Sequence, residues 1–229
     1  MSSNAERVGH VGLNPHNREV LDPNSVEVRF GDPMVDAARL LQLFTDPETI
    51  EHIAGITPDT TEGEIRDLYR NSDLILLTAE TPSGLIVGVI TAQKPAFGAT
   101  AAGVLRLAVD VAYRGNRNLR IGNKLIKTVN ALIFRDARDV EHQGLNCSQA
   151  RASVILGVEG ELKAQNAFTR EGYVRGAELV GTTLGWSNRL GRIVNRNSQP
   201  MFLYRTWYMD NRKEELANYF PKPRPPKVA

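Results

Sequence analysis

Cysteine is almost absent from this chain of 229 residues, which contains only Cys147. A single cysteine excludes an internal disulfide and any cluster of thiolates that would hold zinc or an iron–sulfur centre. No histidine is adjacent to Cys147 in the sequence, so a buried, unreactive thiol is a better interpretation than a nucleophile. This pattern is typical of a reducing compartment, and we expect the protein in the cytoplasm.

Histidine is also scarce, and its four positions show no pattern that would bind a metal. Zinc sites on helices place histidines at i and i+4, and other metal sites surround histidine with carboxylates. The sequence has neither arrangement, so we expect no metal. The four residues are His10, His16, His52 and His142.

Long apolar runs and several well-known catalytic motifs are missing as well. The first residues contain no apolar run of about 7–15 residues, which a signal peptide or membrane anchor would need. The sequence has no Gly-x-Ser-x-Gly, no Walker A lysine motif and no Gly-x-Gly-x-x-Gly, so hydrolase, nucleotidase and dehydrogenase functions lack support. We expect residues 1–24 to form a flexible arm.

Positive charge exceeds negative charge only slightly, because the formal net charge is +2, and 24% of the residues are charged and 41% hydrophobic. The electric field of so small a net charge does not attract nucleic acid or a membrane. An RNA-binding surface formed by the arginines after residue 188 is a weaker hypothesis than a solvated loop, because few aromatic residues accompany these arginines. We expect one globular domain at 25–210. The extension 211–229 ends in a Pro/Lys/Arg-rich tail that we expect to be extended and unpacked.

Hydrophobic periodicity predicts alternating strands and helices. Asp32-Pro33 offers a helix N-cap, and Thr61 and Glu64 have the spacing of a capping box. Residues 81–84 predict the turn of a hairpin, whereas residues 181–198, rich in glycine, asparagine and arginine, predict a long irregular loop. The predicted strands are 25–30, 73–80, 85–92, 104–111, 152–158 and 200–209, and the predicted helices are 33–44, 47–54, 61–69, 121–138 and 161–170.

The connection between strand 104–111 and the helix that follows it has the features of an anion site. The first four amide N–H groups of a helix lack partners within the helix and lie at its positive end, which suits a pyrophosphate. Gly122 keeps the first turn open to a ligand. The connection and the first helical turn also supply cations, namely Arg114, Arg117, Arg120 and Lys124.

The order of these elements resembles the GNAT superfamily of N-acetyltransferases, and the resemblance covers Ser25 to Met209. The family's cofactor signature is a strand of alternating valines followed by Gln/Arg-x-x-Gly-x-Gly/Ala. The chain matches it at Val109-Asp110-Val111 and at Arg117-Asn118-Leu119-Arg120-Ile121-Gly122, with Arg120 where the family usually has its first glycine. The segment Ala164 to Tyr173 is similar to the family's late helix, which packs beside the pantetheine arm of the cofactor.

The resemblance implies a single α/β (α+β) domain with a central mixed, mostly antiparallel sheet of about seven strands flanked by helices. It also implies a V-shaped splay between strands four and five, where pantetheine lies. The implied co-substrate is acetyl-CoA or another acyl-CoA, and the implied reaction is direct attack of a primary amine on the thioester. The acceptor is then an amine-bearing small molecule or protein, and a homodimer remains open. The implied cofactor-binding residues are Val109, Asp110, Val111, Arg117, Asn118, Leu119, Arg120, Ile121, Gly122, Asn123, Asn166 and Phe168.

Catalytic groups are harder to assign from the sequence. Many family members place a tyrosine acid four residues before the late glycine, where this chain has Phe168. Our candidates for the base are Asp110 and Glu159, acting directly or through water; solvated carboxylates without a role, and a water chain to bulk solvent, are the alternatives. A catalytically weak acyl-CoA sensor or interaction module is the alternative function. Arg189 and Arg192 suggest an acceptor with a carboxylate or phosphate.

Overall fold

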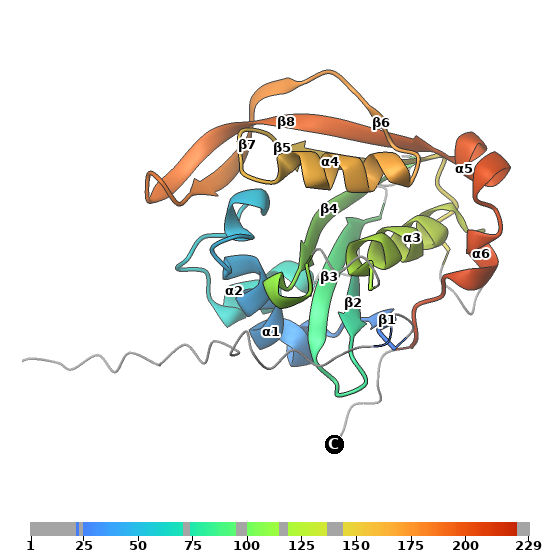
Figure 1. The fold of residues 1–229 in the computed structure, drawn as a ribbon, viewed down its shortest axis with the longest axis horizontal. Helices are drawn as coiled ribbons and strands as arrows, with labels where there is room; N and C mark the ends of the chain where they lie inside the picture. Colours follow the sequence, from blue (N-terminus) through green and yellow to red (C-terminus); the bar gives the residue numbers. More distant parts are fainter. Residues whose placement is uncertain are drawn as a thin grey trace, which may run out of the picture.

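The computed structural model describes Asp22 and residues 25–70, 74–94, 100–114, 119–136 and 144–223. These residues form one mixed sheet with helices on both faces (Figure 1). Apart from Asp22, the arm that we expect at 1–24 lies outside the described residues, as does the tail from residue 224. None of the helices in the described ranges is long and apolar enough to cross a membrane.

The sheet contains eight strands in the described part of the chain, in the order β1-β2-β3-β4-β5-β8-β6, with β7 paired to β8. All pairs are antiparallel except β4 with β5. The mixed, mostly antiparallel sheet is therefore confirmed, with eight strands in place of about seven. The strands are β1 (Glu27–Phe30), β2 (Leu74–Glu80), β3 (Ile86–Gln93), β4 (Ala101–Val109), β5 (Gln149–Ile155), β6 (Val174–Arg175), β7 (Leu179–Ser187) and β8 (Arg192–Tyr204).

Helices cover the two faces of the sheet unequally. In Figure 1, α1 and α2 lie on one side of β2–β4 and α3 lies on the other, and each group encloses its own apolar core. The predicted caps are confirmed, because the Asp32 carboxylate accepts from the Met34 N–H at 2.9 Å and Thr61 and Glu64 form the capping box. The helices are α1 (Pro33–Thr45), η1 (Ile50–His52), α2 (Glu62–Tyr69), η2 (Val111–Tyr113), α3 (Ile121–Phe134), α4 (Glu161–Arg170), α5 (Arg205–Asn211) and α6 (Glu215–Asn218).

A β-bulge in β4 opens the sheet. Val104 pairs with Ala92 and Arg106 pairs with Thr91, so Leu105 is an extra residue on β4. Extra residues of this kind bend a strand and increase its twist. The parallel ladder to β5 ends at the same place, with the pair formed by Val104 and Ala152, and in the described residues β4 then continues beside β3 alone. The expected splay between strands four and five is confirmed.

The predicted loop 181–198 is wrong, because these residues form most of a β-hairpin. Trp186 pairs with Ile193 and Leu184 pairs with Asn195, and the chain reverses through a turn that contains Gly191 with φ 58°. Asn188 and Gly191 belong to the turn, whereas Gly185 and Asn195 lie on the strands, where they keep the main-chain pairing. The pairing is irregular between Leu179 and Thr183, around Gly181. The hairpin places its turn beside η1.

Several boundaries also differ from the predicted ones. β4 and β5 begin three residues earlier than predicted, at Ala101 and Gln149, because their parallel pairing extends that far. The predicted helix 47–54 is reduced to η1, since Ile53 adopts an extended conformation that buries it with Ile50. The predicted strand 200–209 ends at Tyr204, where α5 begins.

The start of the C-terminal tail is packed, which corrects the expectation for residues up to 223. Lys222 forms a parallel bridge to β1, in which its N–H donates to the Val28 carbonyl at 2.9 Å and its carbonyl accepts from the Phe30 N–H at 3.1 Å. In α6, the buried Glu215 carboxylate accepts from Lys127 of α3 at 2.8 Å. The extension from residue 211 to 223 therefore covers α3 and the edge strand.

Candidate functional site

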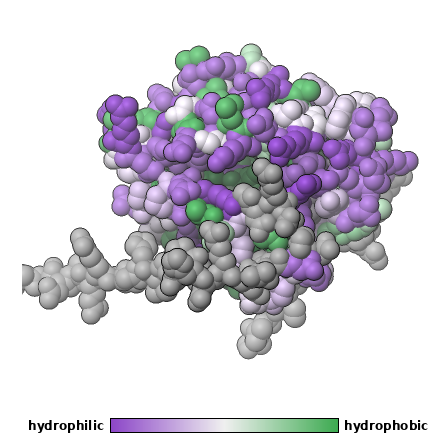
Figure 2. All heavy atoms as spheres, viewed as in Figure 1, coloured by the Kyte–Doolittle hydropathy of each residue, from purple (hydrophilic) through white to green (hydrophobic). Residues whose placement is uncertain are grey.

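A cavity of about 1180 Å³ lies where β4 and β5 separate. Its walls are β4 from Val104 to Val109, the start of α3, the end of β5, one face of α4, and η1 with the residues before it. Figure 2 shows this face of the molecule hollowed near its centre, with hydrophobic residues deep in the recess and hydrophilic residues at its rim. A long, partly apolar ligand fits such a space.

The start of α3 forms one end of the cavity. Arg120, Ile121, Gly122 and Asn123 all line it. The Lys124 N–H donates to the Arg120 carbonyl at 3.0 Å, so the amide groups before Lys124 precede the helical ladder and lie at the positive end of the helix. Among the described atoms outside its own helix, a Cβ atom on Gly122 would meet Val109 Cγ2 alone, at 3.8 Å, so a ligand can approach the backbone closely. This end suits a pyrophosphate.

Arg120 has the left-handed backbone conformation that glycine favours, with φ 45° and ψ 40°. The conformation explains why glycine is usual at this position, and it costs an L-residue about 1–2 kcal/mol. Arg120→Gly should therefore leave stability unchanged or raise it by up to about 1 kcal/mol in urea unfolding, after the extra entropy of glycine is allowed for. If the cavity holds CoA, as the resemblance in the sequence implies, the same variant should bind it about 3- to 10-fold more weakly, because a cation at the helix start is lost. Tighter binding would mean that the arginine crowds the ligand.

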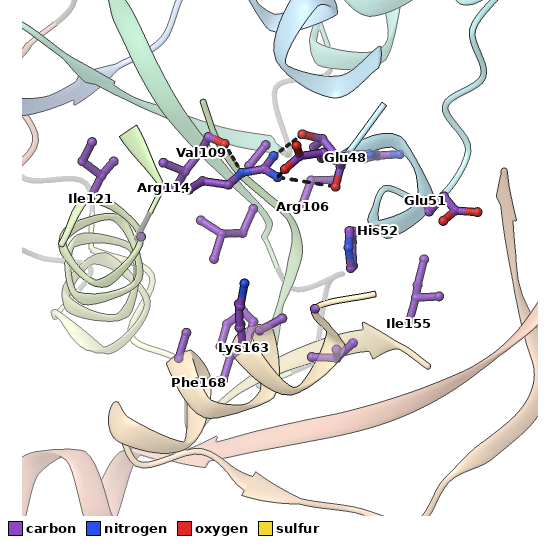
Figure 3. Close-up of a pocket in the computed structure, with 18 of the residues that line it drawn as sticks. Glu48, Glu51, His52, Arg106, Val109, Arg114, Ile121, Ile155, Lys163 and Phe168 are labelled. Atoms are coloured by element: carbon purple, nitrogen blue, oxygen red, sulfur yellow. Dashed lines mark hydrogen bonds and ion pairs between the residues drawn. The ribbon is translucent and has the colours of Figure 1, made fainter. Parts of the chain in front are cut away.

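The side chains of two other predicted cations contact other segments of the chain. Arg114 binds the Val109 carbonyl through Nε at 2.7 Å and also contacts Thr49 and the Glu48 carboxylate, as the dashed lines in Figure 3 partly show. The Lys124 ammonium donates to the Val26 carbonyl at 3.3 Å. Arg114 therefore ties the end of β4 to the segment before η1.

The remaining predicted cofactor residues are divided between the cavity and its surroundings. Val109, Val111 and Phe168 line the cavity. The Phe168 ring packs edge-on against the Tyr173 ring, with 5.1 Å between the ring centroids. Leu119 is 1% exposed and belongs to the core, whereas Asn166 is exposed on α4 and is not among the residues that line the cavity. Arg117 and Asn118 lie outside the described residues.

The two base candidates differ sharply in their surroundings. Glu159 is exposed and lines the cavity at the β5–α4 connection. The Asp110 carboxylate accepts from the Ala112 N–H at 2.8 Å and forms an ion pair with Arg39, and the cavity lining does not include it. The contacts of Asp110 are those of a cap and a salt bridge.

Asp110→Asn should destabilise the protein by roughly 2 kcal/mol, because the Arg39 side chain, 18% exposed, would lose its anion. The measurement is urea unfolding. If the protein catalyses the acetyl transfer that the resemblance implies, the folded variant should keep its rate of acetyl transfer. A rate at least about 100-fold below that of folded wild type would identify Asp110 as the base.

His52 is a cavity residue that sequence reasoning did not select. It lies at the end of η1 and reaches the cavity together with Glu48 and Glu51 (Figure 3). Burial is the main cause that lowers its pKa below the usual 6.5, and the nearby charges of Arg114 and Arg196 lower it further. No periodicity marks a residue in a single helical turn, so only the folded chain brings it to the site.

The β7–β8 hairpin contributes to the site through its turn. The Asn188 N–H donates to Glu51 Oε1 at 2.9 Å, and Arg196 binds the same carboxylate at 3.0 Å. Arg189 and Arg192 are exposed, and neither is among the residues that line the cavity. The arginines that suggested an anionic acceptor therefore lie outside the described cavity wall. Within the described ranges, no group of three His, Cys, Asp or Glu residues is placed to hold a metal.

The sheet order, the parallel β4–β5 pair and the helix that starts beside the splay define the GNAT fold of N-acetyltransferases, and the resemblance found in the sequence is confirmed at the level of the fold. The chain is similar to solved structures of the spermidine N-acetyltransferase SpeG from Vibrio cholerae. A SpeG mutant is 16% identical with a TM-score of 0.61, and the match covers 82% of this chain and 98% of that one. SpeG in complex with CoA and spermine is 13% identical with a TM-score of 0.60, covering 81% and 98%. No family model and no curated protein sequence matches the chain.

Proposed function

We propose that the protein transfers an acetyl group from acetyl-CoA to a primary amine. The observation that carries the proposal is the cavity that opens after the Leu105 bulge and runs to the start of α3. It joins an unpaired strand edge, which suits the amides of pantetheine, to a helix start, which suits a pyrophosphate. A CoA complex of a protein with the same fold supports this choice of ligand.

The residues fit the two ends of CoA differently. Main-chain groups of β4 between Leu105 and Val109 would hold the pantetheine arm, while Gly122 and its neighbours would hold the pyrophosphate. The apolar face of α4, with Ala164, Ala167 and Phe168 in the cavity wall, would pack against the arm. Acetyl-CoA supplies an activated carbonyl whose thiolate leaves, and the protein has to position the amine and remove its proton.

The end of the cavity opposite the start of α3 offers a carboxylate to an amine acceptor. Glu48 and Glu51 form ion pairs with Arg114 and Arg196, whereas Glu159 is exposed in the same wall, which also includes Arg106 and Lys163. A carboxylate beside the cavity attracts an ammonium group and repels an anionic acceptor. A solved protein of the same fold holds spermine, so polyamines come first in a panel of acceptors.

An acyl-CoA sensor is the second candidate. Two observations favour it. Phe168 offers no phenol to protonate the leaving thiolate. The Val109 carbonyl, on the strand proposed to bind pantetheine, already accepts a hydrogen bond from Arg114. Such a protein would bind CoA through the same cavity and would not turn it over. Both candidates therefore predict CoA binding, and only catalysis separates them.

Calorimetry with acetyl-CoA and CoA, followed by thiol release against an amine panel, tests both candidates. The enzyme requires binding of acetyl-CoA and release of CoA thiol with at least one amine. Binding without thiol release across polyamines, amino acids and peptide amines would favour the sensor. Absence of binding at millimolar ligand would exclude both.

A further inference from the structure

His52 is part of the wall of the candidate site. In Figure 3 its ring lies beside η1, on the same side of the cavity as Glu51 and Ile155 and across from the start of α3. The same cavity is lined by β4 beyond the bulge, where the thioester would lie under the proposed function. His52 therefore faces the place where an amine and an acyl group would meet.

The imidazole lies beside the β5–α4 connection. A Cβ atom added to Gly160 would lie 4.0 Å from His52 Nε2. The main chain of Glu159 acts on the ring in the direction that favours its protonated form. A neutral imidazole has one N–H and one lone pair, so it can take one proton while it keeps one donor.

The residue next to His52 fixes the position of η1. Glu51 is bound by the Asn188 N–H and by Arg196, both from the β7–β8 hairpin. The Asn188 side chain also donates to the Pro47 carbonyl at 2.8 Å. Segments that are distant in the sequence thereby hold a single helical turn, which is the support that a positioned catalytic group needs.

Burial and nearby charges lower the pKa of His52. Burial has the largest effect, and Arg114 and Arg196 lower the pKa as well, against the opposing effects of the Glu159 main chain and Glu51. The other charged residues of the cavity wall are Glu48, Arg106, Arg120, Glu159, Lys163 and Arg170. Because the pKa lies below 6.5, the ring is unprotonated at neutral pH and remains so somewhat below pH 6.5.

We propose that His52 is the general base of the acetyl transfer. The neutral amine attacks the thioester carbonyl, and the new C–N bond makes the amine nitrogen acidic. His52 accepts that proton through its free nitrogen while the C–S bond breaks and its electron pair leaves on sulfur. The proton then passes from the imidazolium to the thiolate, giving the amide and the CoA thiol. This inference rests on the proposed function, and it replaces Asp110 and Glu159 in the role of base.

The test compares His52→Gln with wild type over a range of pH. Glutamine keeps an N–H donor on a neutral polar side chain, but it does not accept a proton at these pH values. The variant should lose about 10²- to 10⁴-fold in kcat, whereas its Kd for CoA should stay within about twofold of the wild-type value. Wild type should lose kcat/KM at acidic pH, below 6.5, and the variant should lack this limb. Free imidazole should partly restore the activity of His52→Ala.

Each outcome has a distinct meaning. If His52→Gln retains wild-type kcat while His52→Ala does not, His52 has only a structural role and the proposal is wrong. If Glu159→Gln, and not His52→Gln, removes the acid limb, Glu159 is the base and the proposal is equally wrong. If wild type binds CoA but releases no thiol with any amine, the enzyme itself is excluded. Failure of the base and failure of the function are thus separated by the wild-type measurement.

Discussion

Gly122→Glu should abolish CoA binding and leave the fold intact. The glutamate would stand in the first turn of α3, where its carboxylate is favourable for the helix but occupies the place proposed for the pyrophosphate. Loss of the close backbone approach and the repulsion between like charges should raise the Kd for CoA by at least about 100-fold, or about 2.8 kcal/mol. Calorimetry on folded protein is the measurement.

Gly122→Ala is the matched control for this prediction. In the described part of the chain its Cβ would meet Val109 Cγ2 at the ordinary contact distance of 3.8 Å, and the variant adds a methyl group without charge. CoA binding should weaken by no more than about threefold, which corresponds to about 0.7 kcal/mol. Wild-type affinity in the glutamate variant would show that CoA does not bind at the start of α3.

Gly172→Ala should cause a large loss of stability for the addition of a single methyl group. Gly172 ends α4 with φ 90°, and an added Cβ would lie 1.9 Å from Trp207 Cζ3 and 2.1 Å from Cη2. The backbone conformation alone costs about 1–2 kcal/mol, and displacing the indole, which is 37% exposed, adds about 1–3 kcal/mol. We expect a decrease of about 2–5 kcal/mol in the free energy of unfolding, measured in urea.

Gly191→Ala separates the cost of the backbone conformation from the cost of the contact with Trp207. Gly191 has φ 58° in the turn of the β7–β8 hairpin, and no described heavy atom would lie within 4 Å of the added Cβ. Only the backbone cost remains, so the loss should be about 1–2 kcal/mol. Equal losses at Gly172 and Gly191 would contradict the contact with Trp207.

The sequence was most informative where a pattern is local. The capping box at Thr61, the Asp32 cap and the β2–β3 hairpin each depend on residues close together in the chain, and each is confirmed. The GNAT fold followed from the order of such elements. The β7–β8 hairpin was missed because its strands carry exposed polar residues and glycine, and its stability comes from pairing along β8.

The candidate site was less predictable because it depends on where side chains point. Arg114 was expected to bind phosphate because it lies in a basic loop, but its guanidinium donates to the Val109 carbonyl. Asp110, which follows β4, forms an ion pair with Arg39 and accepts from the Ala112 N–H. His52 reaches the cavity only because η1 is held against the hairpin turn. Each of these contacts joins residues whose separation in the chain gives no periodic signal.

The extra residue at Leu105 changes which side chains of β4 face each core. Ala102 and Val104 belong to the core beneath α3, and beyond the bulge it is Leu107 and Val109 that contact this core, while Ala108 turns to the core beneath α1 and α2. Even-numbered positions thus exchange faces with odd-numbered ones at a single point. Removing one residue at the bulge would restore the regular alternation of β4 and let it continue beside β5, which would close the cavity between the two strands. A substitution on β4 would change only the side chains that line this cavity. Evolution of this protein should therefore tolerate changes in the side chains of β4 more readily than a change in its length.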